Sequence, residues 1–255
     1  MMKIPVVLHQ QDVAPSLANK ICQLAAAKIT VSFEINLKSF FFTLGFFYKK
    51  TAEKIELTGN PFRQELASGN KENALHFFGL KADWPTLLVL GGGTGAEFIN
   101  NLVTKNLPEL VKIIQVVHST GVGKLNIPYR QNYHPYEFID NMKDAYAAAD
   151  IVLARAGMST ITELSNLGKV AIIIPMPGTH QEYNAELLRV FAAAFRIRQS
   201  NINPEGLIYL VRQILFDLNL QQGLAKNISK IMPHHAGEKI ARIIIKIAEG
   251  RHATK

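Results

Sequence analysis

The chain has little of what disulfide-linked or membrane-spanning proteins require. Cys22 is the single cysteine among 255 residues, so it has no partner within the chain, which fits a reducing compartment. Its apolar helical surroundings predict a core position rather than a nucleophile. No hydrophobic run approaches the roughly 20 residues of a membrane span, and no signal peptide opens the sequence. We therefore expect a soluble, cytoplasmic protein.

Metal ligands and nucleic-acid motifs are also scarce. The histidines His134, His180 and the pair His234-His235 have no carboxylates at the spacing of metal ligands, so we expect neither a metal nor a cofactor. The formal net charge of +8 predicts attraction to an anionic partner. Because the lysines and arginines are scattered, a phosphorylated substrate or an acidic membrane face fits better than nucleic acid.

Strands and helices alternate regularly from residue 86 onward, which predicts a doubly wound α/β domain with a parallel sheet. The predicted strands are Thr86–Leu90, Ile113–His118, Tyr133–Phe138, Asp150–Ala154 and Val170–Pro175. The predicted helices are Ala96–Asn106, Met142–Ala149, Thr160–Leu167, Gln181–Ala194, Pro204–Leu218, Gln221–Ile231 and His235–Glu249.

The first 60 residues predict only part of a second sheet. We expect three strands and one helix there, Lys3–Leu8, Lys28–Phe33, Lys54–Leu57 and Pro15–Ala27. Such a sheet needs helices on both faces, so we expect uncovered apolar surface. The turn residues from Thr58 predict a change of lobe. The predicted domains are a partial first lobe at 1–62, a linker at 63–85, a second domain at 86–232, and a helix at 233–255 that returns to the first lobe.

An aromatic segment, Ser39–Lys50, carries five phenylalanines and a tyrosine beside two lysines. It lacks the alternation of a core hairpin. Two interpretations stay open: an apolar wedge that dips into a membrane interface, or a loop folded onto the first lobe.

The turn within Ala154–Gly168 joins a buried strand to a helix. Ser159 or Thr160 is predicted to cap this helix, and Glu163 follows at the spacing of a capping box. Free amides and a positive dipole end at the carboxyl edge of a parallel sheet are typical of phosphate sites. The alternative is an ordinary capped helix, in which Glu163 bonds its own backbone.

Two glycine-bearing loops resemble nucleotide motifs without completing them. Gly91–Ala96 can approach a diphosphate closely, but the next strand ends in His118 and Ser119 instead of the acid that a nicotinamide cofactor requires. Gly121–Leu125 lacks the first glycine and the final Ser/Thr of a P-loop. These departures exclude a dehydrogenase and an ATPase of those types.

A third loop, His180–Asn184, begins the helix after another predicted strand. The three loops are therefore expected to converge on one crevice. Amides and hydroxyls suit a neutral sugar, and Glu163 suits the two hydroxyls of a ribose.

Seven motifs follow one another in the order found in the MurG family of bacterial glycosyltransferases, which the chain resembles over almost its whole length. These motifs are LHQQ from Leu8, TGNPFR from Thr58, LVLGGGTG from Leu88, EFIDNM from Glu137, YAAADIVLARAGMSTITEL from Tyr146, GKVAIIIPMP from Gly168 and HQEYNA from His180. The resemblance implies a GT-B-like fold, with a complete C-terminal doubly wound domain and a partial N-terminal Rossmann-like lobe. It also implies inverting transfer of N-acetylglucosamine from its UDP-sugar to the lipid-linked muramoyl-pentapeptide of peptidoglycan, on the cytoplasmic face of the membrane.

The resemblance also implies roles for individual residues. Arg63 contacts the nucleotide, and the Ile139 backbone pairs with uracil. Glu163 binds the ribose hydroxyls, and Gln181 and Asn184 face the N-acetylglucosamine. The remaining implied donor-site or acceptor-side residues are Asp12, Gly92, Gly93, Thr94, Met158, Ser159, Thr160, Ile161, Thr162 and His180.

Three departures from the family pattern concern the acceptor side and the diphosphate loop. Gly93 stands where the family has serine, and Gln10 and Asp12 alter its HEQN motif. The glycine-rich start of the family's first lobe, with its candidate catalytic histidine, has no counterpart, which leaves His9 as a weak candidate base. The alternatives are a donor-binding subunit whose partner chain supplies that lobe, a truncated relic, and a UDP-sugar epimerase.

Overall fold

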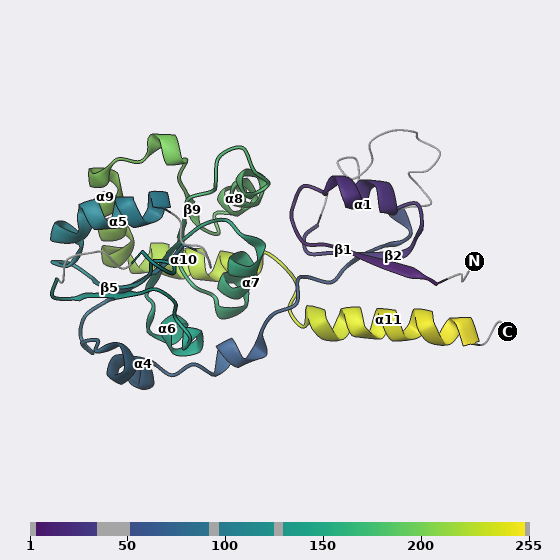
Figure 1. Cartoon of the computed structure of the whole chain (residues 1–255), viewed down its shortest axis with the longest axis horizontal. Helices are drawn as coiled ribbons and strands as arrows, with labels where there is room; N and C mark the ends of the chain where they lie inside the picture. The colour runs from purple at the N-terminus through teal and green to yellow at the C-terminus, as the bar shows by residue number, and fades with distance from the viewer. Residues whose placement is uncertain (1–3, 35–51, 92–96, 125–129, 253–255) are drawn as a thin grey trace. The chain divides into compact units, whose positions relative to one another are not determined.

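The computed structural model describes residues 4–34, 52–91, 97–124 and 130–252. The chain divides into two compact units, shown in Figure 1. The first comprises Met1–Phe62 with Ile231–Lys255, and the second comprises Arg63–Lys230. We describe each unit by itself.

The second unit contains a six-stranded sheet in which every neighbouring pair is parallel. Its order is β6-β5-β4-β7-β8-β9. The strands are β4 (Thr86–Leu90), β5 (Gln115–Ser119), β6 (Tyr133–Tyr136), β7 (Ile151–Ala154), β8 (Ala171–Ile173) and β9 (Phe195–Arg196). The chain runs outward from β4 to β6 and then returns to the other side of β4, so β4 and β7 flank the point where the strand order reverses. This arrangement confirms the predicted doubly wound sheet.

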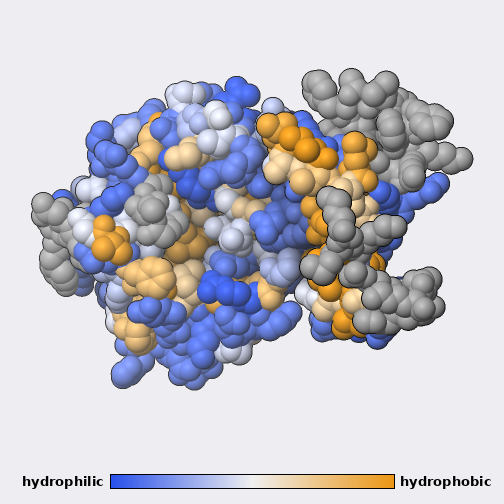
Figure 2. Space-filling view, turned by 45° about the vertical axis from the view of Figure 1, so that its right-hand side comes forward, coloured by the Kyte–Doolittle hydropathy of each residue, from blue (hydrophilic) through white to orange (hydrophobic). Residues whose placement is uncertain are grey.

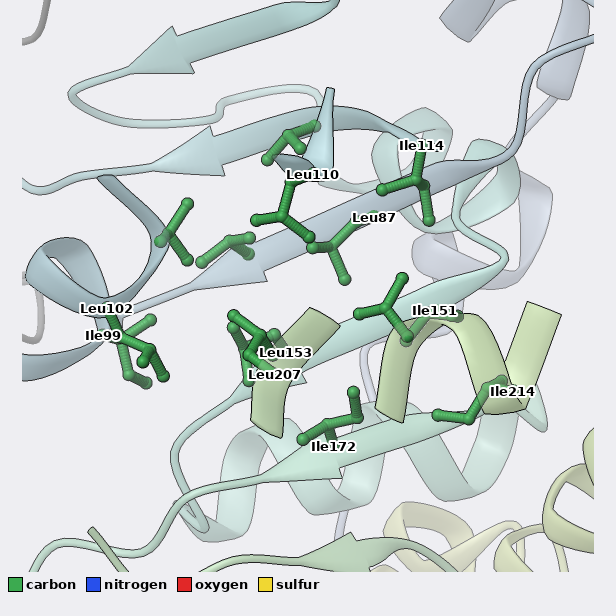
Figure 3. Packing of buried hydrophobic residues seen from close by; sticks show 14 of the residues in the cluster. Leu87, Ile99, Leu102, Leu110, Ile114, Ile151, Leu153, Ile172, Leu207 and Ile214 are labelled. Carbon is green, nitrogen blue, oxygen red and sulfur yellow. The ribbon is translucent and has the colours of Figure 1, made fainter. Parts of the chain in front are cut away.

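Helices cover both faces of this sheet. The helices are α4 (Lys71–Phe78), α5 (Glu97–Leu110), α6 (Met142–Ala148), α7 (Met158–Leu167), α8 (Gln181–Val190), α9 (Pro204–Phe216) and α10 (Leu218–Ile228), with short 3₁₀ turns η1 (Gln64–Ser68) and η2 (Gln199–Asn201). Figure 3 shows Leu87, Leu153 and Ile172 of the strands gathered with Leu207 and Ile214 of α9. All these side chains are buried, as expected for strands covered on both faces.

Residues 63–85, predicted as a linker, are folded within the second unit. They include η1 and α4, and both elements pack against α6. The Asn70 amide donates to Asp144 Oδ1 of α6 at 2.8 Å. A Cβ added at Gly69 would lie 2.0 Å from the Lys143 carbonyl oxygen, so the two backbones touch at a place that only glycine fits.

The first unit contains a parallel sheet in the order β1-β2-β3. Its elements are β1 (Val6–Gln10), α1 (Leu17–Cys22), β2 (Ala26–Val31), β3 (Ile55–Leu57) and α11 (Ala236–His252). The helix predicted over Pro15–Ala27 was too long, because α1 ends at Cys22 and Ala26 begins β2, where it pairs with Val6 of β1. The aromatic segment Ser39–Lys50 lies within 35–51, outside the described residues.

Apolar side chains stay exposed on the first unit, as the small number of elements predicts. Helix α1 buries no residue, and Leu17, Ile21 and Leu24 are exposed. Cys22 is exposed too, so its predicted core position was wrong. In Figure 2 hydrophobic residues gather on the surface that this unit forms. Among the described helices, none has the length and hydropathy needed to cross a bilayer.

Candidate functional site

The site lies at the carboxyl edge of the six-stranded sheet, where β7 leads into α7. Helix α7 begins at Met158, and its N-cap is Gly157, with φ −71° and ψ 143° and no side-chain cap. The predicted cap at Ser159 or Thr160 was therefore wrong, because both residues already lie in the first helical turn. The first amides of a helix have no partner within it, so those of Met158, Ser159 and Thr160 carry the positive end of the helix dipole.

Glu163 is held by two side chains rather than by its own helix. Its Oε1 accepts a hydrogen bond from Arg63 Nη2 at 2.8 Å, and its Oε2 accepts one from Tyr146 Oη at 2.6 Å. The pKa of Arg63 is raised, chiefly by this hydrogen bond with Glu163. Burial raises the pKa of Tyr146 well above its ordinary value, so its phenol stays a donor. The capping-box alternative does not hold, because the carboxylate points to other elements.

A cavity of 340 Å³, the Glu163 pocket, opens in front of this carboxylate. It is lined by Arg63, Leu90, Ser119, Phe138, Ile139, Asp140, Met142, Ser159, Thr160 and Glu163. These residues come from the carboxyl ends of β4 and β5, the loop after β6, and the first turns of α6 and α7, with Arg63 preceding η1. The cavity thus combines an apolar wall, a carboxylate and a helix N-terminus.

A larger cavity of 820 Å³, the Arg155 pocket, lies on the other side of Leu90 and Thr160, which line both. Its other lining residues are Gly91, Glu97, Phe98, Asn101, Lys124, Arg155, Gly157, Met176, Pro177, Gln181 and Gln199. The first turn of α7 therefore borders two neighbouring cavities. One holds the Glu163 carboxylate, and the other is lined by Glu97 together with amides, cations and aromatic surface.

Arg155 organises the wall of the larger pocket. Its Nη1 donates to the carbonyls of Ile174 and Pro175 at 3.0 and 3.1 Å, and its Nη2 donates to Gln199 Oε1 at 3.1 Å. The guanidinium carbon lies 5.8 Å from the centre of the Phe98 ring, within the range of a cation–π contact. Burial lowers the pKa of Arg155. The sequence reasoning gave Arg155 no role, although its place beside the glycine turn was a usable signal.

Of the predicted sugar-facing residues, Gln181 lines the Arg155 pocket, whereas His180 and Asn184 do not. Gln181 Oε1 accepts from the Met176 amide at 3.1 Å. His180 is exposed at the start of α8. Asn184 is fully buried, and its Nδ2 donates to the Ala156 carbonyl at 3.1 Å, which ties α8 to the turn before α7. A sugar contact by these residues stays a prediction.

Other predicted residues fall into two groups. Met158, Ile161 and Thr162 have buried side chains, and Thr162 Oγ1 donates to the Met158 carbonyl, so these three support the turn from inside. Gly92, Gly93 and Thr94 lie outside the described residues. Gly91, just before them, lines the Arg155 pocket.

The histidine one residue before the end of β5 is part of the core. His118 is fully buried, and its ring nitrogens lie 3.0 Å from Tyr133 Oη and Asn100 Oδ1. Burial lowers the pKa of His118 to about 4, so the ring is neutral near pH 7. The next residue, Ser119, faces the Glu163 pocket. No acid occupies this strand end, which agrees with the exclusion of a nicotinamide site.

The acceptor-side candidates belong to the first unit. His9 Nδ1 lies 2.8 Å from Thr30 Oγ1 and His9 Nε2 lies 3.0 Å from Asn60 Oδ1. Gln10 is buried, and its Nε2 donates to the Asp12 carbonyl at 2.7 Å. These bonds fold the loop after β1 onto the sheet. Within the ranges that the structure describes, no three His, Cys, Asp or Glu residues are grouped as metal ligands would be.

The fold and site together define a glycosyltransferase of the GT-B type. Residues 86–239 match the family model described as "Glycosyltransferase family 28 C-terminal domain". A solved structure, described as Acinetobacter baumannii MurG, superposes with a TM-score of 0.70 at 25% identity, covering 95% of this chain and 66% of that one. A glycosyltransferase of kitacinnamycin shares the fold, with a TM-score of 0.65 at 16% identity, over 90% of this chain and 56% of that one.

Curated relatives narrow this class to one family. They are named UDP-N-acetylglucosamine--N-acetylmuramyl-(pentapeptide) pyrophosphoryl-undecaprenol N-acetylglucosamine transferase. The protein from Thermoanaerobacter sp. (strain X514) is 33% identical over 96% of this chain and 68% of its own length. The Flavobacterium psychrophilum protein is 35% identical over 97% of this chain and 67% of its own length. The chain belongs to this family, the MurG family, and spans about two thirds of the length of these relatives.

Proposed function

We propose that this chain binds UDP-N-acetylglucosamine and takes part in the transfer of N-acetylglucosamine to the lipid-linked muramoyl-pentapeptide of peptidoglycan. The names of its relatives describe that reaction. The observation that carries the donor site is Glu163, a carboxylate that lines a pocket together with Ser159 and Thr160 of the first turn of α7. A nucleoside diphosphate sugar has the matching sequence of groups: a diol, a diphosphate and a polar ring.

In this proposal the nucleoside occupies the Glu163 pocket. The aromatic and aliphatic side chains of Phe138 and Ile139 offer surface to a base, and the Glu163 carboxylate accepts hydrogen bonds from the ribose hydroxyls. The diphosphate lies at the first turn of α7, where Ser159 and Thr160 present free amides. The sugar then reaches the Arg155 pocket, in which Gln181 provides a hydrogen-bonding amide.

The reaction is proposed to be a direct, inverting displacement. An acceptor hydroxyl oxygen forms a bond to the anomeric carbon while the bond from that carbon to the diphosphate oxygen breaks, and the electron pair leaves with UDP. The α7 amides and Arg63 stabilise the negative charge that grows on the diphosphate, which is electrostatic catalysis. The acceptor hydroxyl loses its proton to a base, for which His9 remains the weak candidate; Asp12 is proposed to lie on the acceptor side.

The acceptor in this proposal is lipid-linked, and we propose that the reaction takes place at the cytoplasmic face of the membrane. A net charge of +8 favours approach to an anionic surface. The proposal includes a partner chain for the acceptor side. The exposed Leu17 and Ile21 of α1, with Leu24 in the turn that follows, are the surface that such a chain would cover.

Titration calorimetry with UDP-N-acetylglucosamine tests the donor site. We expect the wild-type chain to bind, and Glu163→Ala to weaken binding by about 1–3 kcal/mol, the usual effect of an unmatched polar partner. Glu109→Ala is the matched control, because Glu109 near the end of α5 is exposed and pairs with Lys112, which follows the helix. Absence of binding by a folded wild-type chain, or equal affinity of wild type and Glu163→Ala, would refute the site.

A further inference from the structure

Tyr146 stands behind the Glu163 pocket without lining it. The side chain projects from α6, is fully buried, and donates its phenolic hydrogen to Glu163 Oε2 at 2.6 Å. A hydrogen bond of this length to a charged oxygen is among the stronger kinds. Because Tyr146 is fully buried, water does not reach its hydroxyl to compete for this bond. The Oε2 position of Glu163 is therefore fixed from inside the protein.

The other oxygen of Glu163 has a different kind of partner. Oε1 accepts from Arg63, whose side chain is 57% exposed, whereas the Glu163 side chain is 12% exposed. Because the Arg63 guanidinium is largely exposed, water and salt compete for it and weaken this side of the ion pair. One carboxylate oxygen thus has a permanent partner, and the other has a partner that a ligand can displace.

We propose that Tyr146 is a positioning residue for the ribose of the nucleotide: it holds Glu163 Oε2 so that Oε1 exchanges Arg63 for ribose hydroxyls. This inference rests on the proposed function and deepens it, because it names how one carboxylate binds the ligand diol. A glutamate side chain in solution samples many rotamers, and ordering it on binding would cost affinity. Tyr146 orders it before the ligand arrives. Arg63, once released, is free to turn to the diphosphate.

Binding of UDP, 2′-deoxy-UDP and 3′-deoxy-UDP to wild type and Tyr146→Phe tests the assignment by calorimetry. The substitution removes one oxygen atom and keeps the ring. We expect Tyr146→Phe to lose about three- to tenfold in affinity for UDP and less than about twofold for at least one deoxy analogue. The ratio of the affinity for UDP to the affinity for that deoxy analogue, which measures recognition of the missing hydroxyl, therefore falls. In a Glu163→Gln background the same substitution should leave this ratio unchanged, because the carboxylate it orders is gone.

Tyr133→Phe is the matched control, since Tyr133 is also a buried tyrosine but its hydroxyl bonds His118 rather than a pocket residue. We expect it to leave every UDP-to-deoxy-UDP ratio at the wild-type value. An equal loss of affinity for all three ligands in Tyr146→Phe would show a general structural role and overturn the proposal. If wild type fails to bind UDP, the proposed function fails instead, which separates the two outcomes.

A second variant keeps the test decisive if Tyr146→Phe does not fold. Replacement of Tyr146 by 3-fluorotyrosine keeps the ring and the hydroxyl and makes the phenol a stronger donor. We expect the ratio of the affinity for UDP to that for the deoxy analogue to be at least as large as in wild type. A smaller ratio in the folded fluorinated protein would contradict the positioning role.

Discussion

The two units each contain a parallel sheet, but the two sheets differ in how much of their apolar surface is covered by helices. In the second unit, helices cover both faces of the sheet, and strands such as β4 are buried along their whole length. Among the described residues of the first unit, the buried apolar cluster of the sheet contains Ala26, Ile29 and Val31, and Leu17 and Ile21 of α1 are exposed. The difference teaches that a parallel sheet becomes a stable core only when each face receives a helix that buries its own apolar side.

The largest expected difference between the units concerns the same substitution made in each. Leu153→Ala empties a fully buried position on β7, so we expect the free energy of unfolding to fall by about 2–5 kcal/mol. Leu17→Ala in α1 removes a side chain that is 73% exposed, so we expect a change within about 0.5 kcal/mol. Urea denaturation followed by circular dichroism measures both. Equal losses in the two variants would contradict the contrast between the units.

The second expected effect is a pH dependence that arises in the second unit. Burial lowers the pKa of His118 to about 4, below its ordinary value of 6.5. The folded state therefore favours the neutral ring, so stability is fully present above pH 6.5 and is lost as the pH falls from 6.5 to about 4. The loss is about 1.4 kcal/mol per pH unit in this window, or about 3 kcal/mol in all.

Urea denaturation of wild type and His118→Gln across that window measures this effect. Gln keeps an amide that can bond within the pocket of Asn100 and Tyr133 but does not titrate. We expect the stability of His118→Gln to depend less steeply on pH than that of wild type. Parallel pH profiles for the two proteins would show that protonation of His118 does not limit the stability of this unit.

Much of the second unit could be predicted from the sequence, because its strands are short apolar runs separated by turn residues and its helices follow them regularly. The placement of Glu163 also followed from the sequence, since it stands at a fixed distance after a buried strand. The N-cap did not follow from the sequence. Ser159 and Thr160 were the expected caps, but the extended residue before the helix is Gly157, so both polar residues lie inside the first turn. Local patterns fix which element forms, but backbone angles at its first residue decide which side chains cap it.

Long-range contacts were beyond the sequence. Tyr146 and Glu163 are 17 residues apart in the sequence and meet in a fold where α6 and α7 both pack against η1. Arg155 meets Gln199 because β7, β8 and η2 end at the same edge. In the first unit, the alanines at 26 and 27 favour a helix by propensity, yet pairing with β1 places Ala26 in the core of a sheet. Tertiary pairing overrode local preference at that point.

A third prediction tests whether the first unit has any tightly packed region of its own. Gly59 has φ +84°, and a Cβ there would lie 2.0 Å from the Pro233 carbonyl oxygen. Gly59→Ala is therefore expected to cost about 1–3 kcal/mol through backbone strain and displacement. Gly223→Ala, within α10 and with no atom near the added Cβ, is expected to stabilise by about 0.5–1 kcal/mol. Thermal unfolding of both variants gives the comparison, and an unaltered Gly59→Ala protein would mean that residues 59 and 233 do not pack.

The smallest expected effect falls on Cys22, where the sequence-based expectation and the structure disagree. A cysteine in the core would lose stability on replacement by serine, because a buried hydroxyl needs a hydrogen-bond partner. Cys22 is exposed on α1, so we expect Cys22→Ser to change the free energy of unfolding by less than about 0.5 kcal/mol. Because it is the single cysteine, a thiol reagent added to the folded protein should label one group without denaturant. A thiol that reacts only after unfolding would return Cys22 to the core and reduce the contrast between the two units.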